Sequence, residues 1–308
     1  AIALRIRSYQ KYTSGDSTSR STGARTPLCD TIGQVPGTLY IVATPIGNLE
    51  DITYRAVRVL GSVSGIACED TRLTRRLLDR YGIQTKLLSL HDHNEREQSV
   101  RILDMVGAGA DIAVVTDAGT PLISDPGFRL VREARERGFA VVPLPGPSAV
   151  MAALSAAGQP TDAFYFGGFL DEKESGRRAE LSRRANDPTT LVYFEAPHRL
   201  IRTLDDITTL LPGRPVVVAR ELTKIHEEFL RGTAEELAAL LRATPERVRG
   251  ECTIVIGKAK EAPPPDDREL QKELRSLIDQ GRSRSDAAKE LARKYGLSKR
   301  QLYSLGEA

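Results

Sequence analysis

Apolar residues in the first half of the chain gather in short runs that are rich in β-branched side chains. These runs cover residues 39–43, 65–67, 112–115 and 140–144, and longer segments with helical spacing separate them. Short apolar runs of this kind are typical of buried strands. Strands that alternate with helices predict a parallel sheet with helices on both faces.

Two of the intervening helices have recognisable ends. Asp51 is predicted to be the N-cap of the first helix, because its side chain can accept a hydrogen bond from a free backbone amide there. Asp125 and Pro126 are predicted to open a helix over residues 128–137, and Gly138 is predicted to end it.

A second alternating segment begins after residue 146. Its predicted strands cover residues 164–166, 191–194, 216–219 and 252–256, and its predicted helices lie near 177–186, 198–210 and 233–242. Thr233 and Glu236 have the spacing of a capping box at the start of the last helix. The sequence therefore predicts an α/β fold of two domains, over residues 36–146 and 147–261, the second with mixed strands.

The end of the chain differs from both segments. Residues 262–266 are predicted to be a linker, because consecutive prolines continue neither a helix nor a strand. Residues 267–308 are predicted to be a helical tail, in which Ser285 caps a helix that Gly296 ends. Three residues of this tail have the spacing of a helix-turn-helix: Ala292, Gly296 and Leu302.

Charge is unevenly distributed along the chain. Residues 282–302 hold seven basic and two acidic side chains, a net charge of +5 that suits either nucleic-acid contact or a solvated helical face. The whole chain carries only +3, and its 40% hydrophobic and 28% charged residues are typical of globular proteins.

Residues 1–29 hold five basic residues and one acid, a composition that suits an organelle transit peptide, an upstream start or a disordered segment. We predict that residues 1–35 are a disordered extension.

The cysteines exclude a zinc site of the usual spacing. Cys29, Cys68 and Cys252 are scattered, with no CxxC and no nearby histidine pair, so no metal site is predicted. An odd number of cysteines suits the reducing cytoplasm, where we expect the protein. Cys68 and Cys252 lie in apolar runs and are predicted to be small buried side chains. No run of about 18 apolar residues occurs, so no membrane span is predicted.

Four predicted strands end in loops rich in glycine and proline. These loops lie at residues 44–48, 117–127, 143–148 and 194–199. Ligands of open α/β sheets bind at the carboxyl ends of strands, where glycine allows close backbone approach and proline fixes the loop shape. One such loop is typical of a plain turn, but four at strand ends predict a binding cleft.

Several enzyme classes are disfavoured by what these loops lack. GxGxxG does not follow the first strand, and neither GxxxxGK[ST] nor GxSxG occurs in the chain. NAD-dependent enzymes, P-loop NTPases and α/β-hydrolases therefore fit the sequence poorly.

The same loops resemble those of the bacterial small-subunit rRNA cytidine 2′-O-methyltransferases, a branch of the tetrapyrrole methylase superfamily. The resemblance spans residues 36–260 and rests on GTLYIVATPIGNL at 37–49, EDTR at 69–72, LHDHNE at 90–95, the loop at 117–127, PGPS at 145–148, HR at 198–199 and ELTK at 221–224. The tail resembles one common in this family, and residues 1–35 have no counterpart. Tetrapyrrole-acting members carry a glycine-rich first loop and Gly-Asp-Pro where this chain has Gly119, Thr120 and Pro121, which favours the RNA branch.

The resemblance implies a fold, a cofactor and partners. It implies two α/β domains with S-adenosylmethionine (SAM) in the cleft between them, a homodimer, and 16S rRNA of the small ribosomal subunit as the substrate. The acceptor would be the ribose 2′-hydroxyl of a cytidine in the decoding region of the assembled subunit. The cofactor-binding residues it implies are Pro45, Ile46, Gly47, Gly119, Thr120, Ile123, Gly146, Ser148, Ala149, Glu195, Ala219 and Glu251.

A ribose hydroxyl is a poor nucleophile, so a base that takes its proton would help the reaction. Asp70 and Lys224 are the predicted catalytic residues, and Glu69, His91 and His93 are alternatives. A lysine serves as a base only where burial or positive neighbours depress its pKa. Asp70 also suits the N-cap of the helix that follows it.

Positive side chains near the motifs are predicted either to contact the RNA or to lie on solvated helix faces. The predicted RNA-binding residues are Arg72, Arg75, Arg76, His91, His93, His198, Arg199 and Lys224. Two other functions stay open. One is a SAM-dependent methyltransferase that acts on a tetrapyrrole or corrin precursor, and the other is a non-catalytic nucleic-acid-binding protein that uses the tail.

Overall fold

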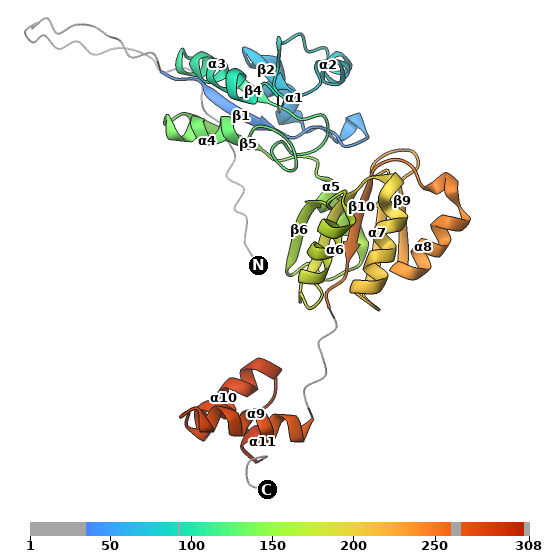
Figure 1. The fold of residues 1–308 in the computed structure, drawn as a ribbon. Helices are drawn as coiled ribbons and strands as arrows, with labels where there is room; N and C mark the ends of the chain where they lie inside the picture. The colour runs from blue at the N-terminus through green and yellow to red at the C-terminus, as the bar shows by residue number, and fades with distance from the viewer. Residues whose placement is uncertain (1–34, 92, 260–265, 305–308) are drawn as a thin grey trace, which may run out of the picture. The chain divides into compact units, whose positions relative to one another are not determined.

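The computed structural model of the chain describes residues 35–91, 93–259 and 266–304 (Figure 1). The disordered extension predicted for residues 1–35 therefore lies, up to residue 34, outside the described residues. Two sheets with flanking helices and a separate group of three helices make up the described part. The predicted α/β class, with two α/β units and a helical tail, is confirmed.

The first sheet is entirely parallel and its strands run in the order β3-β2-β4-β1-β5. Its strands are β1 (Thr38–Val42), β2 (Gly65–Cys68), β3 (Leu87–Ser89), β4 (Ile112–Val114) and β5 (Ala140–Leu144). β1 therefore lies between β4 and β5, and the loops that follow these three strands leave the same edge of the sheet. That edge is where open α/β sheets bind ligands.

Helices cover both faces of this sheet, as predicted. They are η1 (Leu49–Asp51), α1 (Tyr54–Ser62), α2 (Thr71–Arg80), α3 (Glu95–Gly107) and α4 (Phe128–Glu136). Leu39 and Ile41 of β1 pack with α3 and α4, whereas Val42 packs with α1 and α2. This alternation follows from the two-residue period of a strand, which sends successive side chains to opposite faces.

Two predicted caps of these helices are wrong. Thr53, not Asp51, caps α1, and its hydroxyl accepts a hydrogen bond from the Ala56 amide at 3.1 Å. Asp51 lies instead in the short turn η1. Gly127 is the N-cap of α4, and its amide donates a hydrogen bond of 3.1 Å to the Glu95 carboxylate. A side chain of α3 therefore provides the hydrogen-bond acceptor at the start of α4.

The second sheet is mixed and its strands run in the order β6-β7-β10-β8-β9. Its strands are β6 (Phe164–Phe169), β7 (Thr190–Glu195), β8 (Pro215–Arg220), β9 (Glu228–Thr233) and β10 (Cys252–Ile256), with only β6 and β7 parallel among these neighbours. Its helices are α5 (Ala149–Ala157), α6 (Glu174–Arg183), α7 (Pro197–Leu210), α8 (Ala234–Ala243) and η2 (Pro245–Arg247). The capping box of Thr233 and Glu236 at α8 is confirmed.

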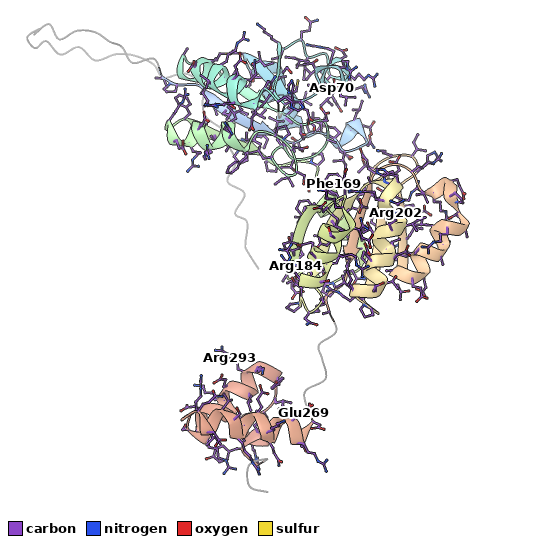
Figure 2. All side chains as sticks on the ribbon, in the orientation of Figure 1. Asp70, Phe169, Arg184, Arg202, Glu269 and Arg293 are labelled. Atoms are coloured by element: carbon purple, nitrogen blue, oxygen red, sulfur yellow. The ribbon has the colours of Figure 1, made fainter. Side chains whose placement is uncertain are left out.

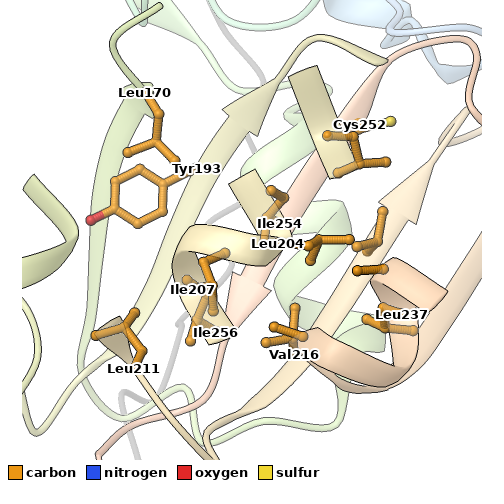
Figure 3. Packing of buried hydrophobic residues seen from close by; sticks show 14 of the residues in the cluster. Leu170, Tyr193, Leu204, Ile207, Leu211, Val216, Leu237, Cys252, Ile254 and Ile256 are labelled. Carbon is orange, nitrogen blue, oxygen red and sulfur yellow. The ribbon is translucent and has the colours of Figure 1, made fainter. Parts of the chain in front are cut away.

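The core of the second sheet explains which helices lie on which face. Tyr193 and Ile254 pack with Leu204 and Ile207 of α7 in one layer (Figure 3). Val192 and Val255 belong to the other layer, which contains α5. Sequence patterns did not predict α5 or β9. The run of small apolar residues in α5 has only a weak amphipathic period, because Met151 and Ala156 on its exposed face are apolar like the buried residues of the other face.

The tail forms its own small core. Its helices are α9 (Asp267–Asp279), α10 (Arg284–Tyr295) and α11 (Lys299–Ser304), and Leu270, Leu274, Leu291 and Leu302 pack together. Ser283, not Ser285, caps α10 through the Asp286 amide at 3.1 Å. Gly296 ends α10 in a left-handed conformation, as predicted for the turn of a helix-turn-helix. The last residues of the predicted tail, 305–308, lie outside the described part.

Other predictions concern single residues and membrane spans. Cys68 and Cys252 are free and buried, as predicted. None of the helices in the described part has both the length and the apolar content that crossing a membrane requires.

Candidate active site

A cavity of about 470 Å³ lies at the carboxyl ends of β1, β4 and β5 and is closed on its other side by residues of the second sheet. Its volume is within the range of about 300–1,000 Å³ that is typical of small-molecule sites. Eight predicted cofactor-binding residues line it: Ile46, Gly119, Thr120, Ile123, Ser148, Ala149, Glu195 and Glu251. The predicted binding loops therefore converge on one cavity.

Backbone hydrogen bonds hold the first-sheet loops together. Thr44 and Gly119 exchange two of them, of 2.8 and 3.0 Å, and so form a bridge between the loops after β1 and β4. Gly119 has a φ of 87°, a left-handed conformation that glycine adopts without strain. The Thr120 hydroxyl donates to the Pro147 carbonyl at 3.2 Å, which joins the loop after β5. The three loops therefore have a fixed shape relative to one another.

Two loops, one after β4 and one after β8, contain strained residues. Leu122 and Ser124 have φ values of 72° and 66°, and Glu221 and Thr223 have values of 52° and 64°. Left-handed conformations are unfavourable for residues with a β-carbon, and they persist where the surrounding structure enforces them, commonly at functional sites. Ser124 lines the cavity, and Thr223 binds the loop after β1, since its hydroxyl accepts the Asn48 amide at 3.1 Å.

The walls of the cavity combine apolar side chains with polar backbone. Phe169, labelled in Figure 2, lies at the end of β6. Its ring centroid is 5.4 Å from that of Phe194, and both side chains line the cavity. Ser148 caps α5 through the Met151 amide, so α5 begins at the cavity wall. Cys252 also lines the cavity, but burial raises the pKa of its thiol to about 12, so it remains protonated and unreactive at neutral pH.

Four predicted cofactor-binding residues do not line this cavity. Gly146 packs against Ala43, where a β-carbon would approach the alanine methyl to 2.8 Å. Ala219 is completely buried in the core of the second sheet. Pro45 and Gly47 line a smaller neighbouring cavity of about 300 Å³ instead.

Glu195 and Arg199 form a buried ion pair beside the cavity. The side chain of Glu195 is fully buried, and its carboxylate accepts Arg199 Nη2 at 2.6 Å and the Thr203 hydroxyl at 2.6 Å. Arg199 is only 10% exposed and its guanidinium neutralises Glu195, so these contacts favour a structural role over the predicted RNA contact. The pair fixes the end of β7 and the start of α7, from which Glu195 and Pro197 line the cavity.

The surroundings of Lys224 do not suit a base. Its ammonium group lies 2.8 Å from Glu221 Oε1 and 3.1 Å from Glu251 Oε2. Partial burial works to lower the pKa of Lys224, but the hydrogen bonds to Glu221 and Glu251 outweigh it and raise the pKa. A raised pKa keeps the side chain charged at neutral pH, so the depressed pKa that a lysine base requires is not found.

Substitutions at Lys224 distinguish a catalytic base from a positive charge that holds Glu221 and Glu251 together. We expect Lys224→Arg to retain most of the activity, because a guanidinium can bind both carboxylates, and Lys224→Met to lose about tenfold through the release of the Glu251 loop. Steady-state methyl-transfer rates of both variants provide the measurement. Equal inactivity of the two variants would instead indicate that Lys224 donates or accepts a proton.

Asp70 lies at the start of α2 (Figure 2) and acts as its N-cap. Its carboxylate accepts the Arg72 amide at 2.8 Å and the Arg72 guanidinium at 2.9 Å. The Arg72 side chain, together with the amide, lowers the pKa of Asp70 to about 2. A carboxylate with so low a pKa is a weak proton acceptor, so the contacts favour the capping role over the catalytic one.

The remaining predicted RNA-binding residues are partly accessible. Arg72 is 87% exposed, Arg76 and His198 are exposed, and Arg75 donates to the Thr85 carbonyl at 3.3 Å. His91 and His93 lie with ring centroids 6.0 Å apart. Across the residues that the structure describes, no cluster of three His, Cys, Asp or Glu side chains could hold a metal ion.

Sequence analysis missed Asp117 as a site residue. Its carboxylate accepts the Asp70 amide at 3.0 Å, and it lines both the main cavity and the smaller one. The position of Asp117 shortly after the predicted strand at 112–115 could have indicated a site residue. Only the fold, however, shows that the end of β4 lies beside the end of β2, which Asp70 follows.

Comparison with known proteins agrees with this architecture. The family model of tetrapyrrole (corrin/porphyrin) methylases matches residues 38–238. A protein of Micromonospora olivasterospora named ribosomal RNA small subunit methyltransferase I is 44% identical over 290 residues, which cover 94% of this chain and 91% of the relative. A relative of the same name from Synechocystis is 46% identical over 272 residues, which cover 87% of this chain and 97% of the relative.

Solved structures show the same fold at lower identity. The uroporphyrin-III C-methyltransferase of Thermus thermophilus, complexed with S-adenyl homocysteine, superimposes with a TM-score of 0.52 at 20% identity over 72% of this chain and 98% of that one. The fold, the cavity at the strand ends and the extended sequence identity agree, and the chain belongs to the tetrapyrrole methylase family, together with the relatives named ribosomal RNA small subunit methyltransferase I.

Proposed function

We propose that this protein transfers the methyl group of SAM to small-subunit ribosomal RNA, and that the acceptor is the ribose 2′-hydroxyl of a cytidine. The observation that carries the proposal is the single cavity built from the loops after β1, β4 and β5, in a chain that belongs to a methylase family and whose relatives are named for rRNA methylation. The decoding region of the assembled subunit is the proposed target, and cytoplasm the proposed location.

The cavity has the chemistry that SAM requires. Phe194, Ile46 and Val150 offer apolar surface for an adenine ring, and polar backbone of the Gly119 and Ser148 loops is available for the ribose and amino-acid portions. The start of α5, at Ala149, favours a carboxylate, because the first amides of a helix lack partners within the helix. We therefore assign SAM binding to these residues.

SAM supplies an electrophilic methyl group on its sulfonium, which is the difficult part of the chemistry. What remains for the chain is to hold the acceptor hydroxyl in line with that group, to exclude water and to receive one proton. The bridged, strained loops suit the first task, because a fixed loop shape avoids reorganisation during the reaction. The apolar walls of Phe169 and Phe194 suit the second.

Exposed basic residues provide the proposed RNA contacts. Arg72 and Arg76 lie on α2 beside the cavities, and His198 lies at the start of α7. In the tail, Arg293 is drawn on the outside of α10 (Figure 2). Neutralisation of phosphate charges by such residues makes binding sensitive to salt. Homodimer formation, which the family resemblance implies, is part of the proposal.

A methyl-transfer assay tests the proposed function. Purified protein is mixed with radiolabelled SAM and with small ribosomal subunits that lack the modification, and naked rRNA and precorrin serve as alternative acceptors. We expect label in the ribose of a cytidine after digestion and mass spectrometry, and more of it on subunits than on naked rRNA. Label on precorrin alone would support the corrin alternative, and failure to bind SAM would support a non-catalytic nucleic-acid-binding protein.

A further inference from the structure

A second cavity, of about 300 Å³, adjoins the first. It lies between the loop after β1 and α2, and it shares Ile46, Asp117 and Ala118 with the main cavity. These three residues therefore form a common wall. A molecule in the second cavity would therefore lie next to a molecule in the first, beside these residues.

The lining of the second cavity suits a flat, partly polar ring. Leu49 and Leu73 remain 39% and 44% exposed at its surface, although large apolar side chains gain from burial. The floor includes Thr116, whose buried hydroxyl has no hydrogen-bond partner in the described part of the chain. An unpaired buried hydroxyl is costly, so a ligand with hydrogen-bonding edges and apolar faces would satisfy both features.

A positive side chain stands at the edge of this cavity. Arg76 lines it, is exposed, and makes no hydrogen bond or ion pair with the residues that the structure describes. Arg72, one helical turn away on α2, is 87% exposed. Guanidinium groups of this kind bind phosphate oxygens well, so the edge of the cavity is suited to a nucleic-acid backbone.

We propose that the second cavity binds the acceptor pyrimidine nucleoside after it has rotated out of the RNA, and that Asp117 accepts the proton of its ribose hydroxyl. This inference rests on the proposed function and adds the acceptor site to it. Enzymes that act on a base rotate the nucleotide out of its stack into a close-fitting pocket, and we extend this mode of binding to a ribose-modifying enzyme. The two cavities meet at Ile46, Asp117 and Ala118, so the ribose of a bound nucleoside would lie next to the methyl donor.

Asp117 is placed to take part in the reaction. One carboxylate oxygen, Oδ1, accepts the Asp70 amide at 3.0 Å, which fixes the orientation of the side chain. The other oxygen has no hydrogen-bond partner among the described residues. During transfer the ribose oxygen forms a bond to the methyl carbon, the carbon–sulfur bond breaks and its electron pair stays on sulfur. The hydroxyl proton passes to this free oxygen and then to solvent.

Filling the second cavity tests the acceptor site. We expect Leu73→Trp to reduce methyl transfer to small subunits on the order of 100-fold, because the larger side chain takes the place of the nucleoside. The dissociation constant for SAM, measured by calorimetry, should stay within about twofold, since Leu73 does not line the main cavity and SAM binding also reports a folded protein. Leu240→Trp, at an equally exposed leucine of α8, is the matched control and should be active.

The outcomes distinguish this proposal from the proposed function. If the unmodified protein labels no RNA, the proposed function fails and the acceptor site with it. If the unmodified protein labels RNA and Leu73→Trp does so at the same rate, only the acceptor site is overturned. Loss of SAM binding in Leu73→Trp would also overturn it, because the variant would then act on the main cavity.

Substitution of Asp117 tests the proton acceptor. Asp117→Asn keeps an oxygen for the Asp70 amide but is not basic, so we expect kcat to fall about 10²–10⁴-fold while KM for the subunit and the affinity for SAM stay nearly constant. A second readout is the pH profile: the acidic limb of kcat that belongs to a carboxylate should disappear in the variant. Unchanged kcat and an unchanged profile would show that Asp117 only positions the loop.

Discussion

Arg199→Ala is expected to lower the free energy of unfolding of the second α/β unit by about 3–5 kcal/mol, because it leaves a buried charge without its partner. The side chain of Glu195 is fully buried, and that of Arg199 is 10% exposed. After the substitution the Thr203 hydroxyl and the Ala196 amide would remain as partners of the carboxylate, without a positive charge. Urea unfolding of the full chain, followed by circular dichroism, provides the measurement.

An exposed ion pair in the same part of the chain provides the control. Arg242 and Asp205 contact at 2.6 Å, but their side chains are 53% and 49% exposed. Since water solvates both charges, Arg242→Ala should cost at most about 1 kcal/mol. Equal costs for the two substitutions would contradict the buried-pair interpretation. If Arg199→Ala instead left stability unchanged and weakened RNA binding, the RNA contact predicted for Arg199 would be supported.

Gly47→Ala is expected to reduce methyl transfer on the order of 100-fold, because a β-carbon at this position has no room. It would lie 2.5 Å from Lys224 Cγ, 2.8 Å from the Leu222 carbonyl oxygen and 2.9 Å from Thr223 Oγ1. The lysine side chain can move, but the carbonyl belongs to the backbone of a strained loop. The two loops must therefore separate, which displaces Ile46, a residue of both cavities.

Another glycine of the same unit is the matched control for this prediction. Gly61 lies in α1, where the nearest atom to an added β-carbon is Ile83 Cγ1 at 3.9 Å. Gly61→Ala should therefore keep full activity and stabilise the helix by up to about 1 kcal/mol. The affinity for SAM and the rate of transfer to small subunits should be measured for both variants. Full activity of Gly47→Ala would show that the loops tolerate separation.

Several parts of the site were predictable because its residues are close in sequence. The loops after β1, β4 and β5 each carry their glycines and prolines within a few residues, and parallel strands place their carboxyl ends at one edge. This pattern predicted a cleft, and the family resemblance named Gly119, Thr120 and Ser148 as cofactor-binding residues; all three line the main cavity. The family resemblance added Glu195 and Glu251, which also line it.

The partners of charged residues could not be predicted, since the sequence does not show which group a charge meets. Arg199 meets Glu195 and Lys224 meets Glu221, both within one helical turn in sequence, yet burial and distance decide whether such a pair forms. Asp70 and Asp117 are 47 residues apart and meet through a backbone amide, which no sequence pattern indicates. The contacts of Asp70 and Lys224 are the reason that we propose Asp117 as the proton acceptor in their place.

The sequence by itself determined the α/β class, the parallel first sheet and the loops of the main cavity, because apolar periodicity, glycine and proline act within short stretches of chain. It also determined the capping box of α8. Only the tertiary structure decided that Thr53 and Ser283 are the caps, that α5 packs on the second sheet, and that a second cavity adjoins the first. Both caps are local hydrogen bonds, so the sequence left open only which of two nearby residues begins each helix. The packing of α5 and the second cavity depend on contacts between distant segments, whose geometry arises when the whole chain packs.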